Sequence, residues 1–125
     1  MIDGEFAQEF AREWIEAWNA HDLERIFSHY RDDFEMSSPL IIERMNEPSG
    51  VLKGKDAIRP YWQRGLAAQP PLHFELDFVT CGVASITLVY RNQSGVRATE
   101  VLFFAPLPTT GEPLQVVRGV AHYAR

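Results

Sequence analysis

The chain has 125 residues, of which 46% are apolar and 23% are charged, and its formal net charge at pH 7 is -5. These values are typical of one globular domain with a single hydrophobic core, so we expect one domain over residues 1–125. The acidic balance and the lack of a basic run argue against nucleic-acid binding, because phosphates attract clustered Lys and Arg. The single cysteine, Cys81, excludes an internal disulfide.

The sequence also argues against export and membrane insertion. Acidic residues, namely Asp3, Glu5 and Glu9, stand where a signal peptide carries positive charge, and no apolar run is long enough to span a bilayer. We therefore expect a cytoplasmic protein that has no membrane partner. His21, His29 and His73 show no metal-ligand spacing with a carboxylate, so we expect no metal. We also expect no cofactor.

The first predicted element is an amphipathic helix that ends near residue 19. Its apolar stripe repeats every fourth residue and consists of Phe6, Phe10, Trp14 and Trp18. We expect Asn19 to adopt the left-handed conformation that ends a helix. Asp22 then offers a carboxylate to the first amides of a second short helix.

The middle of the chain alternates short elements with loop signals. Phe34 to Ser38 predicts a short strand, which Pro39 ends because proline has no amide to donate. Residues 40–50 mix apolar and turn-forming types, which predicts a ragged hairpin. A third helix is expected from Lys55 to about Ala68, with Pro60 distorting its start.

After Pro70 the apolar period changes from that of a helix to that of a strand. Four strands are predicted, at Leu72 to Phe78, Ala84 to Arg91, Val96 to Ala105 and Leu114 to Tyr123. The turns between them are Cys81–Gly82, Asn92–Gly95 and Pro106–Pro113. Helices followed by consecutive hairpins predict an α+β domain with helices on one face of an antiparallel sheet.

A set of aromatic, acidic and turn-forming residues, found mainly near the start of the chain, resembles the nuclear-transport-factor-2-like superfamily. Its members are Trp14, Trp18, Asn19, Ala20, His21, Asp22, Leu23, Phe27, Tyr30, Asp32, Asp33, Phe34, Pro39, Gly50 and the segment Gly54–Arg59. More narrowly, the chain is similar to the SnoaL-like polyketide cyclase and ketosteroid isomerase group. The resemblance implies a cone-shaped α+β barrel with N-terminal helices packed on a curved, mainly antiparallel sheet. It also implies a pocket at one end and a homodimer formed through the other face of the sheet.

Function varies widely on this fold, so the matching site positions matter more than the fold itself. Ketosteroid isomerases use a Tyr, an Asp general base and a protonated Asp. The matching positions hold Trp14, Ser38 and Glu100. An indole cannot transfer a proton and a lone serine is a weak base, so the resemblance favours a related small-molecule pocket over the same reaction.

A second group of candidate residues lies on the last predicted strand. Arg118, Val120 and His122 share a parity, and we expect them to point inward with Glu100. Glu100 and His122 would then form a pair suited to proton abstraction or water activation, with Arg118 beside them. The alternative is that these groups only satisfy one another as a structural network. A slip of one residue in register would turn all of them to the other face.

Large aromatic residues predict a ligand cavity, although most of them would also suit an ordinary core. The candidate ligand-binding residues are Trp14, Trp18, Ser38, Arg59, Trp62 and Tyr90. Trp14 and Trp62 are favoured because a buried indole needs a polar partner. Arg59 could hold an anionic group of the ligand, or pair with a nearby carboxylate.

Two functions of different classes remain open at this point. The first is a small-molecule-binding enzyme, a cofactor-independent isomerase, cyclase or hydrolase that acts on a small hydrophobic ring compound. The second is a non-catalytic ligand-binding or dimerisation module, which the missing general base would favour. A weaker third possibility is a subunit of a larger complex.

Overall fold

The computed structural model describes residues 1–105 and 114–125. The helices are α1 (Gly4–Asn19), α2 (Leu23–Phe27), α3 (Pro39–Met45) and α4 (Lys55–Leu66). The strands are β1 (Tyr30–Ser37), β2 (Val51–Lys53), β3 (Glu75–Cys81), β4 (Ser85–Arg91), β5 (Arg97–Phe104) and β6 (Val116–Tyr123). The predicted turn at Pro106–Pro113 lies outside the described residues.

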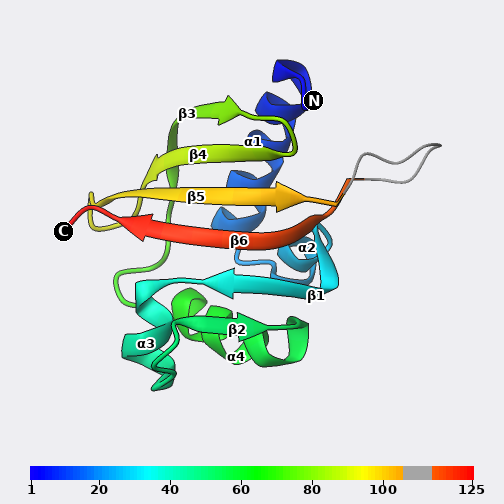
Figure 1. The fold of residues 1–125 in the computed structure, drawn as a ribbon. Coiled ribbons are helices and arrows are strands. Elements are labelled where there is room, and N and C mark those ends of the chain that lie inside the picture. Colours follow the sequence, from blue (N-terminus) through cyan, green and yellow to red (C-terminus); the bar gives the residue numbers. More distant parts are fainter. Residues whose placement is uncertain (106–113) are drawn as a thin grey trace.

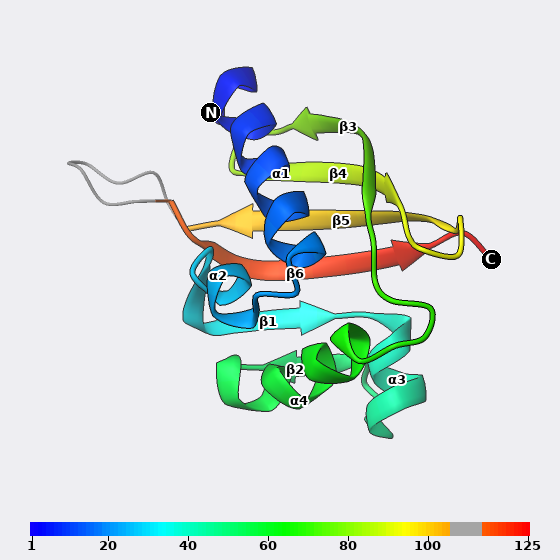
Figure 2. The same cartoon turned by 180° about the vertical axis from the view of Figure 1, so that it is seen from behind.

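The six strands form one curved sheet in the order β2-β1-β6-β5-β4-β3. All neighbouring strands are antiparallel except β1 and β6, which run parallel. Figure 1 shows the open face of the sheet, and Figure 2 shows α1, α2 and α4 packed on the opposite face. The predicted α+β class and the curved, mainly antiparallel sheet are therefore confirmed. None of the described helices is both long and apolar enough to cross a membrane.

The helix α1 forms as its sequence pattern predicts. Asp3 caps it by accepting a hydrogen bond of 2.8 Å from the amide of Phe6. The stripe that includes Trp14 and Trp18 is buried against the sheet. Packing of this stripe, more than helix propensity, stabilises a helix of this length.

The corner after α1 differs from the prediction in one residue. His21, not Asn19, adopts the left-handed conformation, with φ of 54°. Asn19 is the last helical residue, and its side-chain amide both donates to and accepts from the backbone of Phe74, at 2.9 and 2.7 Å. The predicted cap at Asp22 is confirmed, since its carboxylate accepts from the amide of Arg25.

The ragged hairpin predicted for residues 40–50 is wrong, because the segment begins with the helix α3. Ser38 caps this helix through the amide of Leu40, and Pro39 occupies the first turn. Proline is tolerated there because its missing amide would have had no helical partner. Asn46, with φ of 52°, ends α3 in the left-handed conformation.

Other boundaries moved by a few residues. β1 begins at Tyr30, earlier than predicted, and α4 ends at Leu66 with Pro60 inside it. β3 is shifted toward the C-terminus, so Cys81 belongs to the strand and not to the turn. The hairpin turn at Asn92–Gly95 is confirmed, with Gly95 in the left-handed conformation.

The last strand contains a β-bulge that reverses the predicted inward and outward faces. Phe104 pairs with Val116, but the preceding residue, Phe103, pairs with Arg118, so Val117 is an extra residue on β6. A single extra residue shifts the alternation of side chains beyond it. The residues that point inward after the bulge are Gly119, Ala121 and Tyr123, whereas the prediction had Arg118, Val120 and His122.

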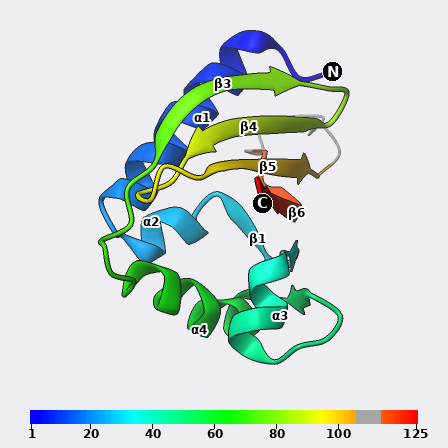
Figure 3. The ribbon, with the colours of Figure 1, turned by 90° about the vertical axis from the view of Figure 1, so that its left-hand side faces the viewer.

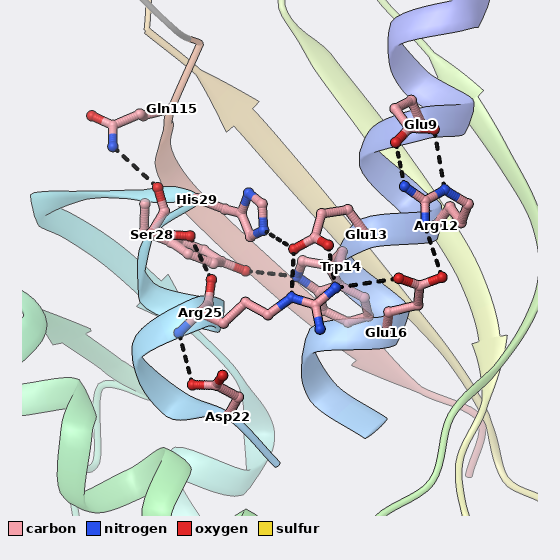
Figure 4. Close-up of polar contacts among 11 residues, drawn as sticks. Glu9, Arg12, Glu13, Trp14, Glu16, Asp22, Arg25, Ser28, His29 and Gln115 are labelled. Carbon is pink, nitrogen blue, oxygen red and sulfur yellow. Dashed lines mark hydrogen bonds and ion pairs between the residues drawn. The ribbon is translucent and has the colours of Figure 1, made fainter. Parts of the chain in front are cut away.

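A charged network fastens α1 to α2 on the outside of the helical layer (Figure 4). The Glu13 carboxylate accepts hydrogen bonds from the guanidinium of Arg25 and, at 2.9 Å, from the ring of His29. Arg25 also reaches Glu16 at 3.2 Å. The Arg25 guanidinium and then His29 hold the pKa of Glu13 at about 2, below its usual 4.5.

We predict that Glu13→Gln lowers the free energy of unfolding by about 1 kcal/mol at pH 7, because partial exposure screens the network. The pKa of Glu13 is lowered in the folded state, so its contribution is present above pH 4.5 and is lost as the pH falls toward 2. Urea unfolding of both proteins at several pH values measures this. Glu5→Gln, on the same helix, is the control and should change little. Equal losses at pH 3 and pH 7 would contradict the prediction.

Candidate functional site

A pocket is lined by residues at the end of β6, in α3 and in the β4–β5 turn. Figure 3 looks onto this end of the sheet. Its volume is about 90 Å³, well above the roughly 10–15 Å³ that one water molecule needs. All three tryptophans and all four tyrosines of the chain line it. The lining residues are Trp14, Trp18, Tyr30, Met36, Leu40, Arg44, Tyr61, Trp62, Gly65, Ala68, Leu72, Phe74, Tyr90, Asn92, Gln93, Glu100 and Tyr123.

Glu100 supplies the carboxyl group of this pocket. It lies on β5 between Leu88 and Ala121, and only 6% of it is exposed. The hydroxyl of Tyr90 donates to its Oε1 at 3.2 Å, whereas Oε2 has no partner among the described residues. Burial raises the pKa of Glu100 to about 8, so its carboxyl group is neutral in most molecules at pH 7.

The tyrosines around Glu100 present neutral hydroxyl groups. Burial is the main cause that raises the pKa of Tyr30, Tyr90 and Tyr123, and the nearby Glu100 adds to it. The indole of Trp14 donates to the hydroxyl of Tyr30 at 2.9 Å. These groups can therefore orient a polar ligand atom by hydrogen bonds but cannot serve as bases near neutral pH.

The predicted cluster of Glu100, Arg118 and His122 is wrong, because the bulge turns the last two residues to the open face of the sheet. Both are exposed, and His122 lies opposite Thr99. The guanidinium of Arg118 lies over the ring of Phe103, at 5.3 Å from its centroid. Glu100 keeps its predicted inward position without either partner.

The predicted ligand-binding residues divide into two groups. Four of them, namely Trp14, Trp18, Trp62 and Tyr90, do line the pocket. Ser38 is not a lining residue; it caps α3 and accepts a hydrogen bond of 3.1 Å from the hydroxyl of Tyr61. Arg59 lies outside the pocket, where it pairs with Glu24 at 2.6 Å.

Several lining residues were not singled out from the sequence as site residues. Tyr123 was missed because of the bulge, and Arg44 because its segment was predicted as a hairpin. Asn92 and Gln93 were assigned to a turn, and nothing in a turn sequence reveals which way its side chains point. Among the described residues, no group of three or more His, Cys, Asp or Glu could hold a metal ion.

Three buried polar atoms have no hydrogen-bond partner among the described residues, and all belong to lining residues. They are Nε1 of Trp18, Oε1 of Gln93 and Oε2 of Glu100. Unpaired buried polar atoms are costly, so native proteins contain few of them. All three unpaired atoms therefore belong to the lining of one pocket.

The family model described as a SnoaL-like domain matches residues 11–125. The chain belongs to the SnoaL-like family. A SnoaL-like protein of unknown function from Burkholderia thailandensis is 48% identical, with a TM-score of 0.89, over 99% of this chain and 98% of that one. A search of the curated proteins finds no match.

More distant structures carry different descriptions on the same fold. A candidate SnoaL-like polyketide cyclase from Shewanella denitrificans is 15% identical, with a TM-score of 0.68, over 95% of this SnoaL-like protein and 90% of that chain. A candidate ketosteroid isomerase from Kribbella flavida is 14% identical, with a TM-score of 0.64, over 97% of this chain and 79% of that one. At such identities the likeness establishes the fold alone.

We predict that the stability of the wild-type protein falls as the pH rises from about 4.5 to about 8, relative to Glu100→Gln. The pKa of Glu100 is raised in the folded state, so over this range the unfolded chain ionises first and gains stability. By pH 8 we expect the stability difference between the two proteins to have changed by about 4 kcal/mol in favour of Glu100→Gln, because each unit of pKa shift corresponds to about 1.4 kcal/mol. Urea unfolding across this range measures the effect, and parallel pH profiles of the two proteins would contradict it.

Proposed function

We propose that this SnoaL-like protein binds a small hydrophobic ring compound in the pocket and acts on it by cofactor-independent proton transfer. Isomerisation, cyclisation and hydrolysis are the reaction types that such a site serves. The observation that carries the proposal is the buried carboxyl of Glu100, which has a free oxygen and a raised pKa in an aromatic pocket.

The chemistry of this carboxyl suits both directions of proton transfer. A group with a pKa near 8 is mostly an acid at pH 7, and its ionised minority is a stronger base than an ordinary carboxylate. The hydroxyl of Tyr90 fixes Oε1, which leaves Oε2 to face the ligand. Rings of the surrounding aromatic residues exclude water, which strengthens every polar contact inside the pocket.

A thermal-shift screen of neutral ring compounds would identify ligands, since a compound that binds only the folded state raises its stability. For a ligand that is also turned over, we predict that Glu100→Gln lowers kcat by about 10²- to 10⁴-fold and leaves binding largely unchanged. Glu75→Gln removes an exposed carboxylate from β3 and is the control. Full turnover by Glu100→Gln would overturn the catalytic role.

A non-catalytic ligand-binding module is the second candidate. It is favoured by the lack of any other carboxyl or imidazole among the described lining residues, since many proton-transfer sites use two such groups. In that case Glu100→Gln would change ligand affinity, and no ligand of the screen would be converted.

We further propose a cytoplasmic homodimer that forms through the open face of the sheet (Figure 1). The lone cysteine is compatible with a reducing compartment. Apolar side chains on the open face include Phe78, of which 54% is exposed, and Val101, which lies between Thr87 and Val120. An apolar patch of this kind favours a covered face.

We predict that Val101→Asp converts a dimer into a monomer, because it places a charge at the centre of the proposed interface. Analytical ultracentrifugation should give twice the chain mass of 14.3 kDa for the wild type and the mass of one chain for the variant. Val83→Asp changes an exposed apolar residue outside the strands and should leave the dimer intact. A monomeric wild type would contradict the proposal.

A further inference from the structure

Arg44 is the cationic side chain that lines the pocket. It lies in the last turn of α3, is exposed at the pocket mouth, and has its backbone oxygen bonded by the guanidinium of Arg64. Among the described residues, no carboxylate lies within ion-pair distance of its own guanidinium. Most other arginines of the described chain do have such a partner.

The Arg44 guanidinium lies against the pocket and not away from it. Its Nη1 is 3.9 Å from the position that a Cβ on Gly65 would occupy, and Gly65 is itself a lining residue. Its charge also acts on Tyr61, whose pKa is raised by burial and lowered in part by Ser38 and Arg44. A guanidinium at this place can therefore reach a group of the ligand near Tyr61.

The charge of the pocket is opposite in sign to that of the protein. Arg44 and Glu100 are the lining residues with acidic or basic side chains other than tyrosine, and Glu100 is mostly neutral at pH 7. The pocket thus carries about one positive charge in a chain whose net charge is -5. An unpaired guanidinium beside apolar rings binds an oxyanion by charge-assisted hydrogen bonds.

The walls and the deep end determine the rest of the ligand. Trp18 and Trp62 pack edge to face at 5.1 Å, and Trp14 and Phe74 stack at 5.7 Å, so flat ring surfaces border the cavity. Glu100 offers a neutral carboxyl with an unpaired Oε2 at the buried end. A neutral oxygen substituent, such as a hydroxyl or a carbonyl, satisfies this oxygen without the repulsion that a second anion would meet.

We propose that the ligand is a flat ring compound with a single carboxylate, which Arg44 binds at the pocket mouth, and a neutral oxygen substituent, which meets Glu100 at the buried end. This substrate class rests on the proposed function of the same pocket. A carboxylate is favoured over a phosphate because one guanidinium balances one negative charge, whereas a phosphate monoester carries nearly two.

The test compares acids with their uncharged amides, which have nearly the same shape. Isothermal titration calorimetry at pH 7 would measure 4-hydroxybenzoate, benzoate and benzamide against the wild type, Arg44→Met and Arg44→Lys, because a single ring suits a pocket of about 90 Å³. Arg31→Met is the control, because it removes the same charge from an exposed residue outside the pocket.

We expect the wild type to bind benzoate at least about tenfold more tightly than benzamide, and 4-hydroxybenzoate more tightly still. Arg44→Met should weaken both acids by about tenfold and leave the amide within about twofold. The affinity of Arg44→Lys for the acids should lie between those of the wild type and Arg44→Met, because lysine keeps the charge but lacks the planar guanidinium. Arg31→Met should match the wild type. Acid binding should also weaken above pH 8, and Glu100→Gln should remove that pH dependence.

The outcomes separate this proposal from the one on which it rests. If amides and neutral ring compounds bind as tightly as the acids, the carboxylate site at Arg44 is wrong and the hydrophobic pocket stands. Equal weakening of acid and amide in Arg44→Met would likewise overturn it. If neither acids nor neutral ring compounds bind, both proposals are wrong.

Discussion

The hydrogen bond from the indole of Trp14 to the hydroxyl of Tyr30 is the contact on which the pocket depends. It joins α1 to β1, while the same indole packs on Phe74 and Tyr90 at 5.7 and 5.5 Å. One side chain thus connects the helix to β1 and to β4, which flank β6 and β5 in the sheet. A buried indole N–H without a partner costs about 1–3 kcal/mol, so this hydrogen bond favours the observed spacing between α1 and β1.

Two carboxyl groups of the chain show how strongly the fold controls their chemistry. Glu13 lies at the edge of the helical layer and meets Arg25 and His29, so its pKa falls to about 2 and it serves as a structural anion. Glu100 lies under the aromatic rings with a hydroxyl as its partner, so its pKa rises to about 8. The residue type is the same, and desolvation set against a nearby cation decides the difference.

Much of the architecture could be predicted because it depends on local patterns. Three features follow from side chains within a few residues of one another. They are the aromatic residue at every fourth position of α1, the cap at Asp22 and the hairpin at Asn92–Gly95. The inward position of Glu100 and the place of Trp14 in the pocket lining came from the resemblance to ketosteroid isomerases and not from a local pattern.

The wrong predictions have two kinds of cause. Some depend on contacts between distant parts of the chain, and others on local signals that fit two different structures. Ser38 followed by Pro39 is a good helix start, but the apolar and turn-forming residues after it also fit a hairpin, and packing against α4 favours the helix. The faces of β6 depend on where Val117 is accommodated between two neighbouring strands, which no pattern within β6 reveals. For Arg59 the sequence left open an anionic group of the ligand or a nearby carboxylate, and in the structure it pairs with Glu24 on α2.

The bulge at Val117 also has an evolutionary consequence. If β6 paired without the bulge, with Val117 opposite Phe103, then Arg118 and His122 would face the cavity and Tyr123 would leave it. A neutral wall of glycine, alanine and tyrosine would be exchanged for one with a guanidinium and an imidazole beside Glu100. A shift of one residue in the pairing of this strand is therefore a route by which the fold acquires a new set of reactive groups in one step, with no substitution at all.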